Sequence, residues 1–177
     1  MARPSGRSRP GCMNVFVQTA MVIFIIATAA SSGNGQTAIS MTGVAGMTFG
    51  TFSRSSELVV NYSSSQAARF TVTGDTARDV RITISITGLA TLNGASINNS
   101  DRDIGITISN SDCAYSLDGG ATWTTFSTGT LYQDTQFPAS LSGRSGIEVR
   151  VGGSITSGTH QQRGAYSGSV TIMAEYR

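Results

Sequence analysis

The residues that most often carry enzyme chemistry are scarce in this 177-residue chain. His160 is its only histidine and lies in a polar loop, and no G-x-S-x-G pattern is present to hold a nucleophilic serine. A serine nucleophile requires a base that a third group keeps in place, and a usual zinc site requires several histidine or cysteine ligands. We therefore expect His160 to be a surface residue, with neither a catalytic triad nor a zinc site around it.

A second candidate for chemistry is a cluster of oxygen-bearing side chains. Asp101 and Asp103 follow closely on Asn98 and Asn99, and such side chains are possible calcium ligands. The spacing of an EF-hand is missing, and no glutamate closes the loop. The cluster therefore favours a solvated turn over a metal site.

Glutamates are the remaining candidates for acid–base work. A glycoside hydrolase places two carboxylates roughly 5 to 9.5 Å apart. Glu57, Glu148 and Glu175 each alternate with apolar residues that are expected to point inward, so each glutamate is expected to face water. The sequence predicts a protein that is not an enzyme and holds no cofactor.

One short motif is specific, although for a turn and not for a reaction. Ser116, Asp118, Gly120, Thr122 and Trp123 fit the pattern S-x-D-x-G-x-T-W, which resembles the Asp-box of sialidase-type propellers. The aspartate is expected to cap backbone N–H groups of the turn, the glycine to supply a positive φ, and the tryptophan to pack beneath. The motif therefore predicts a structural β-hairpin.

The elements that would hold these residues are short and strand-like. Apolar and polar residues alternate with the period of two that a half-buried strand requires. The expected strands are 38–52, 57–62, 67–74, 80–88, 89–92, 103–109, 114–117, 123–126, 129–133, 147–151 and 169–176. Asn93-Gly94 signals a tight hairpin, and Gly152-Gly153 is expected to break a strand. Such regular spacing predicts an all-β, immunoglobulin-like antiparallel β-sandwich.

The first thirty residues are expected to lie outside this domain. Three arginines precede an apolar run over residues 15–30, and small residues follow, with cleavage expected after Ala29 or Ala30. This is the pattern of a secretory signal peptide; the alternative is an uncleaved anchor, although the apolar run is short for the roughly 20 residues of a membrane span. The expected organisation is a signal peptide over 1–30, an N-terminal extension or first strand over 31–46, and one β-sandwich domain over 47–177.

Removal of the leader changes the charge and the cysteine content. Nine basic and ten acidic residues remain, so nothing basic suggests binding to nucleic acid or to an anionic membrane. Cys12 leaves with the leader, and Cys113 is then a single cysteine. A single cysteine in a secreted protein forms an intermolecular bridge or is a buried thiol. Because free cysteine is among the most buried residue types, we favour burial.

The last strand carries a family resemblance. Its inward face is formed by Val170, Ile172, Ala174 and Tyr176, and it is entered through Gly-x-Tyr-x-Gly at residues 164–168. Together with Met47-Thr-Phe-Gly and Phe70-Thr-Val-Thr-Gly, this ending resembles the end strand of chaperone–usher pilus subunits. It is still more similar to a secreted, fimbrial-like bacterial domain family of undefined function.

The resemblance implies a function in assembly. A pilus subunit of that kind lacks its final immunoglobulin strand, and a neighbour's N-terminal extension fills the groove beside its first and last strands. The implied protein is a secreted or cell-surface subunit whose partners are further copies, other pilus subunits, a periplasmic chaperone and an outer-membrane usher. Ile39 and Met41 are then the candidate donor residues, unless their segment is the domain's own first strand.

A second function stays open at the level of sequence. A secreted carbohydrate-binding β-sandwich would present aromatic faces to sugar rings, and Trp123, Tyr115, Tyr132 and Tyr166 are the candidates. Each of these side chains also has an explanation in packing. A pilus subunit is expected to polymerise, whereas a lectin is expected to stay monomeric and bind glycans.

Overall fold

The computed structural model describes residues 20–23, 26–28, 37–86, 89–92, 101–127, 131–139 and 144–177, with only the backbone described for 20–23, 26–28, 86, 89, 144 and 145. The strands are β1 Ala20–Ile23, β2 Ile26–Thr28, β3 Ser40–Ala45, β4 Glu57–Val60, β5 Ala68–Asp75, β6 Asp79–Ile86, β7 Leu89–Leu92, β8 Asp103–Thr107, β9 Cys113–Ser116, β10 Thr124–Thr125, β11 Tyr132–Gln136, β12 Arg144–Val151, β13 Gly153–Thr156 and β14 Tyr166–Tyr176. Within this part, the helical structure is a three-residue 3-10 turn, Asn110–Asp112. No helix there is long and apolar enough to cross a membrane.

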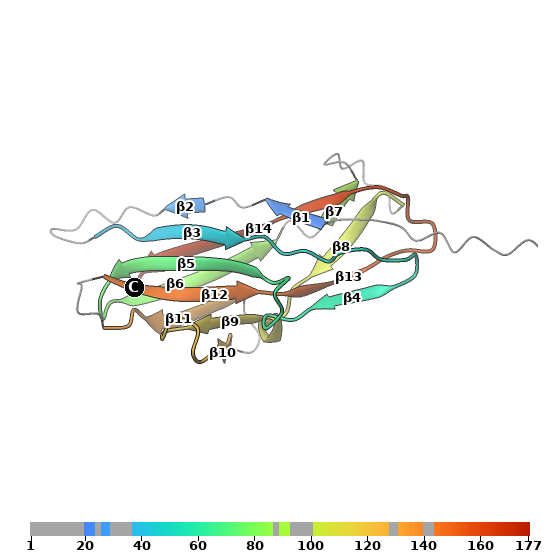
Figure 1. Cartoon of the computed structure of the whole chain (residues 1–177). Coiled ribbons are helices and arrows are strands. Elements are labelled where there is room, and N and C mark those ends of the chain that lie inside the picture. Colours follow the sequence, from blue (N-terminus) through green and yellow to red (C-terminus); the bar gives the residue numbers. More distant parts are fainter. Residues whose placement is uncertain are drawn as a thin grey trace, which may run out of the picture.

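The strands form two sheets that pack face to face in an elongated molecule (Figure 1). The larger sheet has the order β11-β6-β14-β7-β8-β13-β4, and β1 and β2 also pair with β14. The smaller sheet has the order β10-β9-β12-β5-β3. Pairing is antiparallel throughout except for β1 and β2, which run parallel to β14. The predicted all-β sandwich is therefore confirmed.

The core lies between the sheets and follows the alternation of the sequence. In β5 and β6, every second side chain points into the core, while the threonines, serines and arginines between them point outward. The fully buried positions on these two strands and on β12 and β14 include Val72, Val80, Ile82, Ile147, Val149, Val151, Tyr166 and Val170. β-Branched residues suit this half-buried surface, which explains why β6 was the clearest strand in the sequence.

The predicted break at Gly152-Gly153 is confirmed, because β12 ends at Val151, but the chain does not leave the sandwich there. It passes from β12 in the smaller sheet to β13 in the larger sheet, where β13 pairs with β8 and β4. A Cβ at Gly152 would lie 2.1 Å from the Val60 carbonyl oxygen, so only glycine fits this crossing. Strands that switch sheets commonly do so at such a bend.

Other strand boundaries differ modestly from the prediction. The extended stretch 38–52 contains one strand, β3, which ends at Ala45. The weak strand expected at 129–133 is β11, which lies three residues later and pairs with β6. The hairpin predicted at Asn93-Gly94 lies outside the described residues.

Candidate functional site

The candidate site is the edge of β14, the strand on which the family resemblance rests. Its predicted inward residues Val170, Ile172 and Ala174 are buried, and Tyr176 is partly buried and packs against the core. The strand also begins earlier than predicted, at Tyr166, whose side chain is fully buried. β14 is thus a long central strand with one face in the core.

Both ends of β14 are fixed by tyrosine hydroxyls. The Tyr166 hydroxyl donates to the Gln162 carbonyl oxygen at 2.7 Å and accepts from Gln161 Nε2 at 2.9 Å. Burial raises the pKa of the Tyr166 hydroxyl, so it stays protonated as this donor role requires. The Tyr166 ring lies 6.4 Å from the ring of Phe52. This end of the strand is therefore held by its own preceding loop and by the core.

Tyr176 makes the corresponding contacts at the far end, but to different parts of the chain. Its hydroxyl accepts from the Asp75 backbone N–H at 2.8 Å and donates to the Thr37 carbonyl oxygen at 2.8 Å. Its ring meets that of Phe137 edge-on, with centroids 6.0 Å apart. One hydroxyl therefore links β14 to β5 of the facing sheet and to the segment that leads into β3.

The two edges of β14 have different partners. One edge pairs with β6 and β7 in antiparallel fashion. The other pairs with β1, from Ala20 opposite Tyr166, and with β2, which ends with Thr28 opposite Ala174. The difference in residue number between paired residues is the same for β1 and for β2, so both strands follow one register along β14. Both segments lie in the expected leader.

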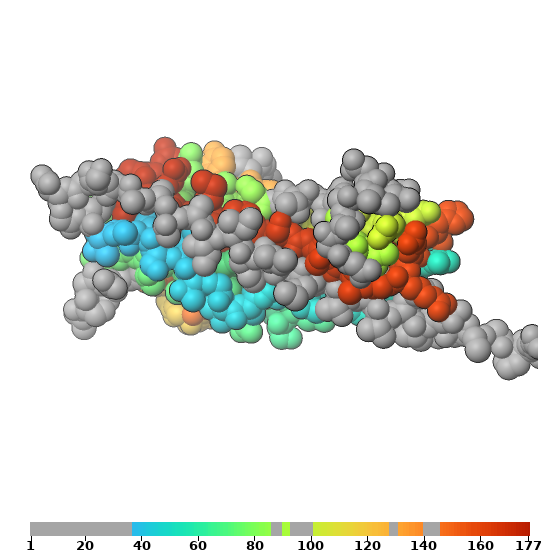
Figure 2. Space-filling model, turned by 90° about the horizontal axis from the view of Figure 1, so that it is seen from above, coloured from blue at the N-terminus to red at the C-terminus, as the bar shows by residue number. Residues whose placement is uncertain are grey.

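β3 lies on the facing sheet next to this edge. Figure 1 shows β1 and β2 along β14, with β3 beneath them, and β2 contacts β3. Seen from above in Figure 2, the surface of β14 (red) lies on the same face of the molecule as that of β3 (blue). We call the boundary between β14 and β3, along which β1 and β2 of the expected leader lie, the leader-filled boundary.

The candidate donor segment has a place in the chain's own fold. β3 pairs with β5, and Ile39 and Met41 are buried in the chain's own core. Of the two roles expected for this segment, the structure describes that of the domain's own first strand. The sandwich therefore includes residues before 47, where the predicted domain began.

The Asp-box residues form a compact turn between β9 and β10. Asp118 accepts from the Thr122 backbone N–H at 2.9 Å and from the Thr122 hydroxyl at 2.6 Å. The Ser116 hydroxyl donates to Asp118 at 2.7 Å and accepts from the Gly120 N–H at 2.8 Å. Trp123 Nε1 donates to the Gly120 carbonyl oxygen at 3.0 Å.

The electrostatics of this turn follow from those contacts. The hydrogen bonds from Thr122, and after them the one from Ser116, lower the pKa of Asp118 to about 2. Gly119 and Gly120 have φ values of 69° and 90°, a region that disfavours other residues. The motif thus holds a hairpin together, as a local structural unit.

The other candidates for chemistry lie apart from one another. His160 is exposed, and no group of three or more histidine, cysteine or acidic side chains that could hold a metal is found in the described part of the chain. Asn98 and Asn99 of the possible calcium cluster lie outside the described residues. Cys113 is buried, and burial, together with Asp112, raises the pKa of its thiol to about 12. An ionised, reactive thiol is disfavoured at this position.

The three glutamates are divided between the two sheets of the molecule. Glu148 faces outward from β12 in the smaller sheet, whereas Glu57 and Glu175 are exposed on β4 and β14 of the larger sheet. The core therefore separates Glu148 from the other two. This placement does not give Glu148 a partner among them for glycoside hydrolysis.

The four aromatic side chains proposed for sugar stacking have different surroundings. Tyr166 is in the core, and Tyr115 packs edge-on against Phe126. Tyr132 is 38% exposed but has the Arg81 guanidinium 4.3 Å from its ring centre. Trp123 lies on the outer face of the smaller sheet beside a hollow. Trp123 is one of the residues that line this hollow.

Two features of these sites were not predicted from the sequence. One is the pairing of β1 and β2 with β14, and the other is a pair of arginines, Arg69 and Arg150, opposite each other on β5 and β12. Alternation alone places both arginines on an outer face. Their proximity depends on the register between two strands that lie far apart in sequence.

The comparisons with known proteins point to one family. No curated protein matches the chain. A family model described as "Domain of unknown function (DUF4402)" matches residues 24–176. The match covers more than half of the chain and takes in the described strands from β2 to β14. The chain therefore belongs to this domain family.

Proposed function

We propose that the protein is a non-enzymatic structural subunit of an extracellular fibre of the fimbria or pilus kind, and that a strand of a neighbouring chain pairs with β14. The observation that carries the proposal is the pairing of β1 and β2 along the second edge of β14. Those residues belong to a segment with the pattern of a secretory leader. Cleavage after Ala29 or Ala30 removes them from the domain.

The exported domain is then incomplete along the leader-filled boundary. The backbone of β14 over residues 166–169 and 172–174 loses its partner on one side. Behind that backbone lie Val170 and Ile172, which are buried in the complete chain. Unpaired backbone groups beside an apolar core cost free energy, and a free strand edge is a template for another strand. The missing strand is therefore best replaced by one from another molecule.

The geometry of the boundary defines what such a strand must do. It adds to β14 by backbone hydrogen bonding, as in other β-augmented complexes, and alternate side chains set its register. In this chain the occupant runs parallel to β14 and spans the length from Tyr166 to Ala174. The boundary also lies between the domain's first strand, β3, and its last, which is where the resemblance to pilus subunits places a donor strand.

The origin of the donor follows from the place of β3. Ile39 and Met41 are in the chain's own core, so their use as a donor would require β3 to leave its own sheet. The stretch between the expected cleavage site and β3 is polar and contains Gly33 and Gly35. Such a stretch fits an apolar boundary poorly. A strand from another pilus subunit or from a periplasmic chaperone is therefore favoured over one from a second copy.

The first test is the form of the exported protein. N-terminal sequencing is expected to give a start between Ala30 and Gln36. Native mass spectrometry is expected to find the exported protein in multimers or bound to a partner that supplies a strand. A stable exported monomer, with amides of residues 166–174 strongly protected from hydrogen exchange, contradicts the proposal.

A matched comparison isolates the leader itself. In a full chain that carries a specific protease site in place of residues 31–36, the uncut protein keeps residues 20–28 and is expected to stay monomeric. After cutting and separation of the leader, amides of residues 166–174 are expected to exchange much faster, while those of β5 and β12 keep their protection. Equal exchange on β14 before and after cutting would show that residues 20–28 do not complete the sheet.

A further inference from the structure

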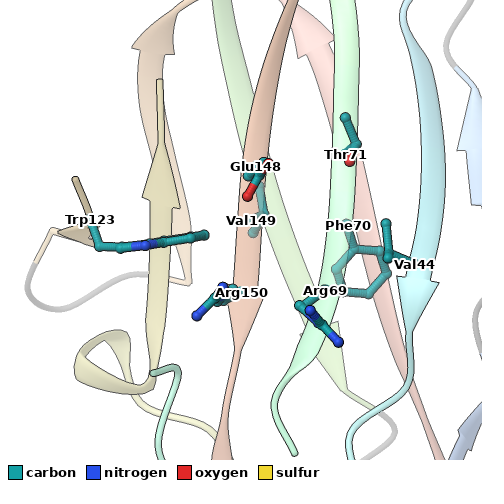
Figure 3. Close-up of a pocket in the computed structure, with 8 residues that line it drawn as sticks. All are labelled: Val44, Arg69, Phe70, Thr71, Trp123, Glu148, Val149 and Arg150. Carbon is teal, nitrogen blue, oxygen red and sulfur yellow. The ribbon is translucent and has the colours of Figure 1, made fainter. Parts of the chain in front are cut away.

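A hollow lies on the outer face of the smaller sheet, away from β14. It has a volume of about 130 Å³ and is floored by β5 and β12. Figure 3 shows Trp123 on one side of these strands and Val44, from β3, on the other. Val44 is 60% exposed, so an apolar side chain is held in solvent at the rim. The hollow is smaller than a pocket for a drug-sized ligand and suits one ring or one charged group.

Two arginines lie opposite each other on the floor of this hollow. Arg69 on β5 and Arg150 on β12 are direct cross-strand partners, and Figure 3 shows them at the same level of the two strands. Like charges in this position repel and destabilise a sheet. Among the described residues, neither guanidinium forms an ion pair with an acid. Among the described side chains, neither arginine of this pair is therefore tied up in a direct ion pair, although the Glu148 carboxylate lies in the same hollow.

The Arg150 side chain is fixed in place. Its guanidinium carbon lies 4.3 Å from the centre of the Trp123 ring, and its Nε atom is buried without a hydrogen-bond partner. Trp123 is in turn fixed by its hydrogen bond to the Gly120 carbonyl oxygen. The Asp-box turn thus holds one arginine of the pair in position and leaves a donor unused. A prearranged arginine costs less entropy when it binds an anion.

The next pair of residues on the floor of the hollow accepts hydrogen bonds and carries no positive charge. Glu148 and Thr71 are cross-strand partners, two residues along from the arginine pair on each strand, and both lie at the hollow. A carboxylate accepts hydrogen bonds, and a hydroxyl both donates and accepts. The Glu148 carboxylate lies against the Asp-box turn, since a Cβ at Gly120 would be 3.1 Å from its Oε2 atom. The hollow therefore offers positive charge at one level and hydrogen-bond acceptors at the next.

We propose that this hollow binds a carboxylated sugar residue of an acidic saccharide. The sugar carboxylate lies between Arg69 and Arg150, and a sugar hydroxyl donates to Glu148. Guanidinium groups recognise carboxylates through paired, charge-assisted hydrogen bonds. A phosphate diester or a free sulfate offers no donor to Glu148 and meets its negative charge. A sugar that carries both a carboxylate and hydroxyls satisfies both levels of the hollow.

This site is independent of the proposed fibre function. The hollow belongs to the smaller sheet, whereas the edge of β14 belongs to the larger sheet. Both a fibre subunit and a monomeric lectin can present it. Trp123, one of the four aromatic residues considered for sugar contact, acts here mainly by holding Arg150.

The test measures binding of the full chain to carboxylated oligosaccharides by isothermal titration calorimetry. The probes are oligomers of galacturonate, glucuronate and sialate, their methyl esters, and sodium sulfate. At least one acidic oligomer is expected to bind. Its uncharged ester is expected to bind at least about tenfold more weakly, because it lacks the charge-assisted contact. Absence of binding by all three acidic oligomers overturns the proposal, and so does sulfate binding as tight as theirs.

Matched variants separate the hollow from general charge. Arg69→Gln is expected to weaken acidic-oligomer binding by about tenfold. Arg177→Gln removes the same charge from an exposed site on the larger sheet and is expected to leave binding unchanged. Glu148→Gln is expected to strengthen sulfate binding and so reduce the preference for the sugar. Melting curves confirm that each variant is folded. If Arg69→Gln and Arg177→Gln weakened binding equally, the acidic oligomer would be held only by the long-range attraction of the protein's positive charge, which would contradict the proposed site.

Discussion

The two layers of the sandwich meet at two boundaries that are closed in different ways. At one, β12 of the smaller sheet continues through Gly152 into β13 of the larger sheet, which pairs with β8 and β4. We call this the continuous boundary. At the leader-filled boundary, the described strands β14 and β3 do not pair with each other, and β1 and β2 lie along β14. The fold therefore closes one boundary with a single covalent strand and the other with a segment that resembles a removable leader.

Under the proposed function, one boundary would serve the stability of the domain and the other its assembly. The continuous boundary depends on close backbone packing that a neighbour cannot supply, so it must form as the chain folds. The leader-filled boundary depends on backbone pairing that any suitable strand can supply. Tyr176 is the described side chain whose hydroxyl bridges this second boundary, from β14 to Thr37 and Asp75. If the proposed function is correct, the subunit would stay folded while it exchanges one strand for another.

The largest effect is expected at the continuous boundary, from Gly152→Ala. The new Cβ would lie 2.1 Å from the Val60 carbonyl oxygen and 2.9 Å from the Tyr62 nitrogen, both of which are backbone atoms. Because backbone atoms cannot yield as a flexible side chain does, we expect a loss of about 3 kcal/mol or more in the free energy of unfolding. Urea titration with circular dichroism measures it.

Gly105→Ala is the matched control for this substitution. Gly105 lies in β8, and a Cβ there meets nothing within 4 Å. Alanine restricts the unfolded chain, so we expect stability within about 1 kcal/mol of wild type, with alanine favoured. Equal losses at the two glycines would show that the crossing at Gly152 does not require close approach.

A smaller effect is expected at the leader-filled boundary, from Tyr176→Phe. The change removes one hydroxyl and leaves the Asp75 N–H and the Thr37 carbonyl oxygen without that partner. Unsatisfied, partly buried groups of this kind cost about 1 to 2 kcal/mol. The loss is expected to be larger in protein without the leader, where fewer links join β14 to β3. Thermal unfolding of both forms measures it.

The control for this prediction is Tyr62→Phe. The Tyr62 hydroxyl has no hydrogen-bond partner among the described residues, so its removal is expected to change stability by no more than about 0.5 kcal/mol. If Tyr176→Phe behaves like Tyr62→Phe in both forms, the hydroxyl bridge does not hold the boundary.

The sequence was informative where the cause of the structure is local. Alternation along β6 and β14 predicted which side chains are buried, because the period of a strand depends on neighbouring residues alone. The Asp-box predicted a capped turn, because Ser116, Asp118 and Thr122 lie within seven residues of one another. The class of fold followed from the number and spacing of such local signals.

What could not be predicted depends on pairing between distant segments. Gly152-Gly153 was correctly expected to end a strand, but the passage into β13 of the other sheet was not predicted, since the close approach of Val60 is not visible in the local sequence. The opposition of Arg69 and Arg150 requires the register of β5 against β12. Similarly, the apolar run before Ala29 predicted a leader, but nothing in it indicates the edge of β14 as its neighbour.

The smallest effect is expected from Asp118→Ala, which touches neither boundary. The carboxylate accepts two hydrogen bonds from Thr122 and one from Ser116 at the surface. Their loss is expected to lower the melting temperature measurably, and by the same amount with and without the leader. The contrast with Tyr176→Phe, whose effect depends on the leader, distinguishes a local hairpin from a link across the leader-filled boundary.

The stabilisation that Asp118 provides is expected to depend on pH. The pKa of Asp118 is about 2 in the folded protein, against an ordinary value of 3.8. A pKa lowered by folding contributes stability that is fully present above the unfolded value and is lost as the pH falls through the folded value. The melting-temperature difference between wild type and Asp118→Ala is therefore expected to be constant above about pH 5 and to shrink toward pH 2.

The control for this pH dependence is Asp118→Asn. It keeps the shape of the side chain without the charge, and its stability is expected to lack the pH-dependent part. A difference that grows on acidification would show that the ionised carboxylate does not stabilise the turn.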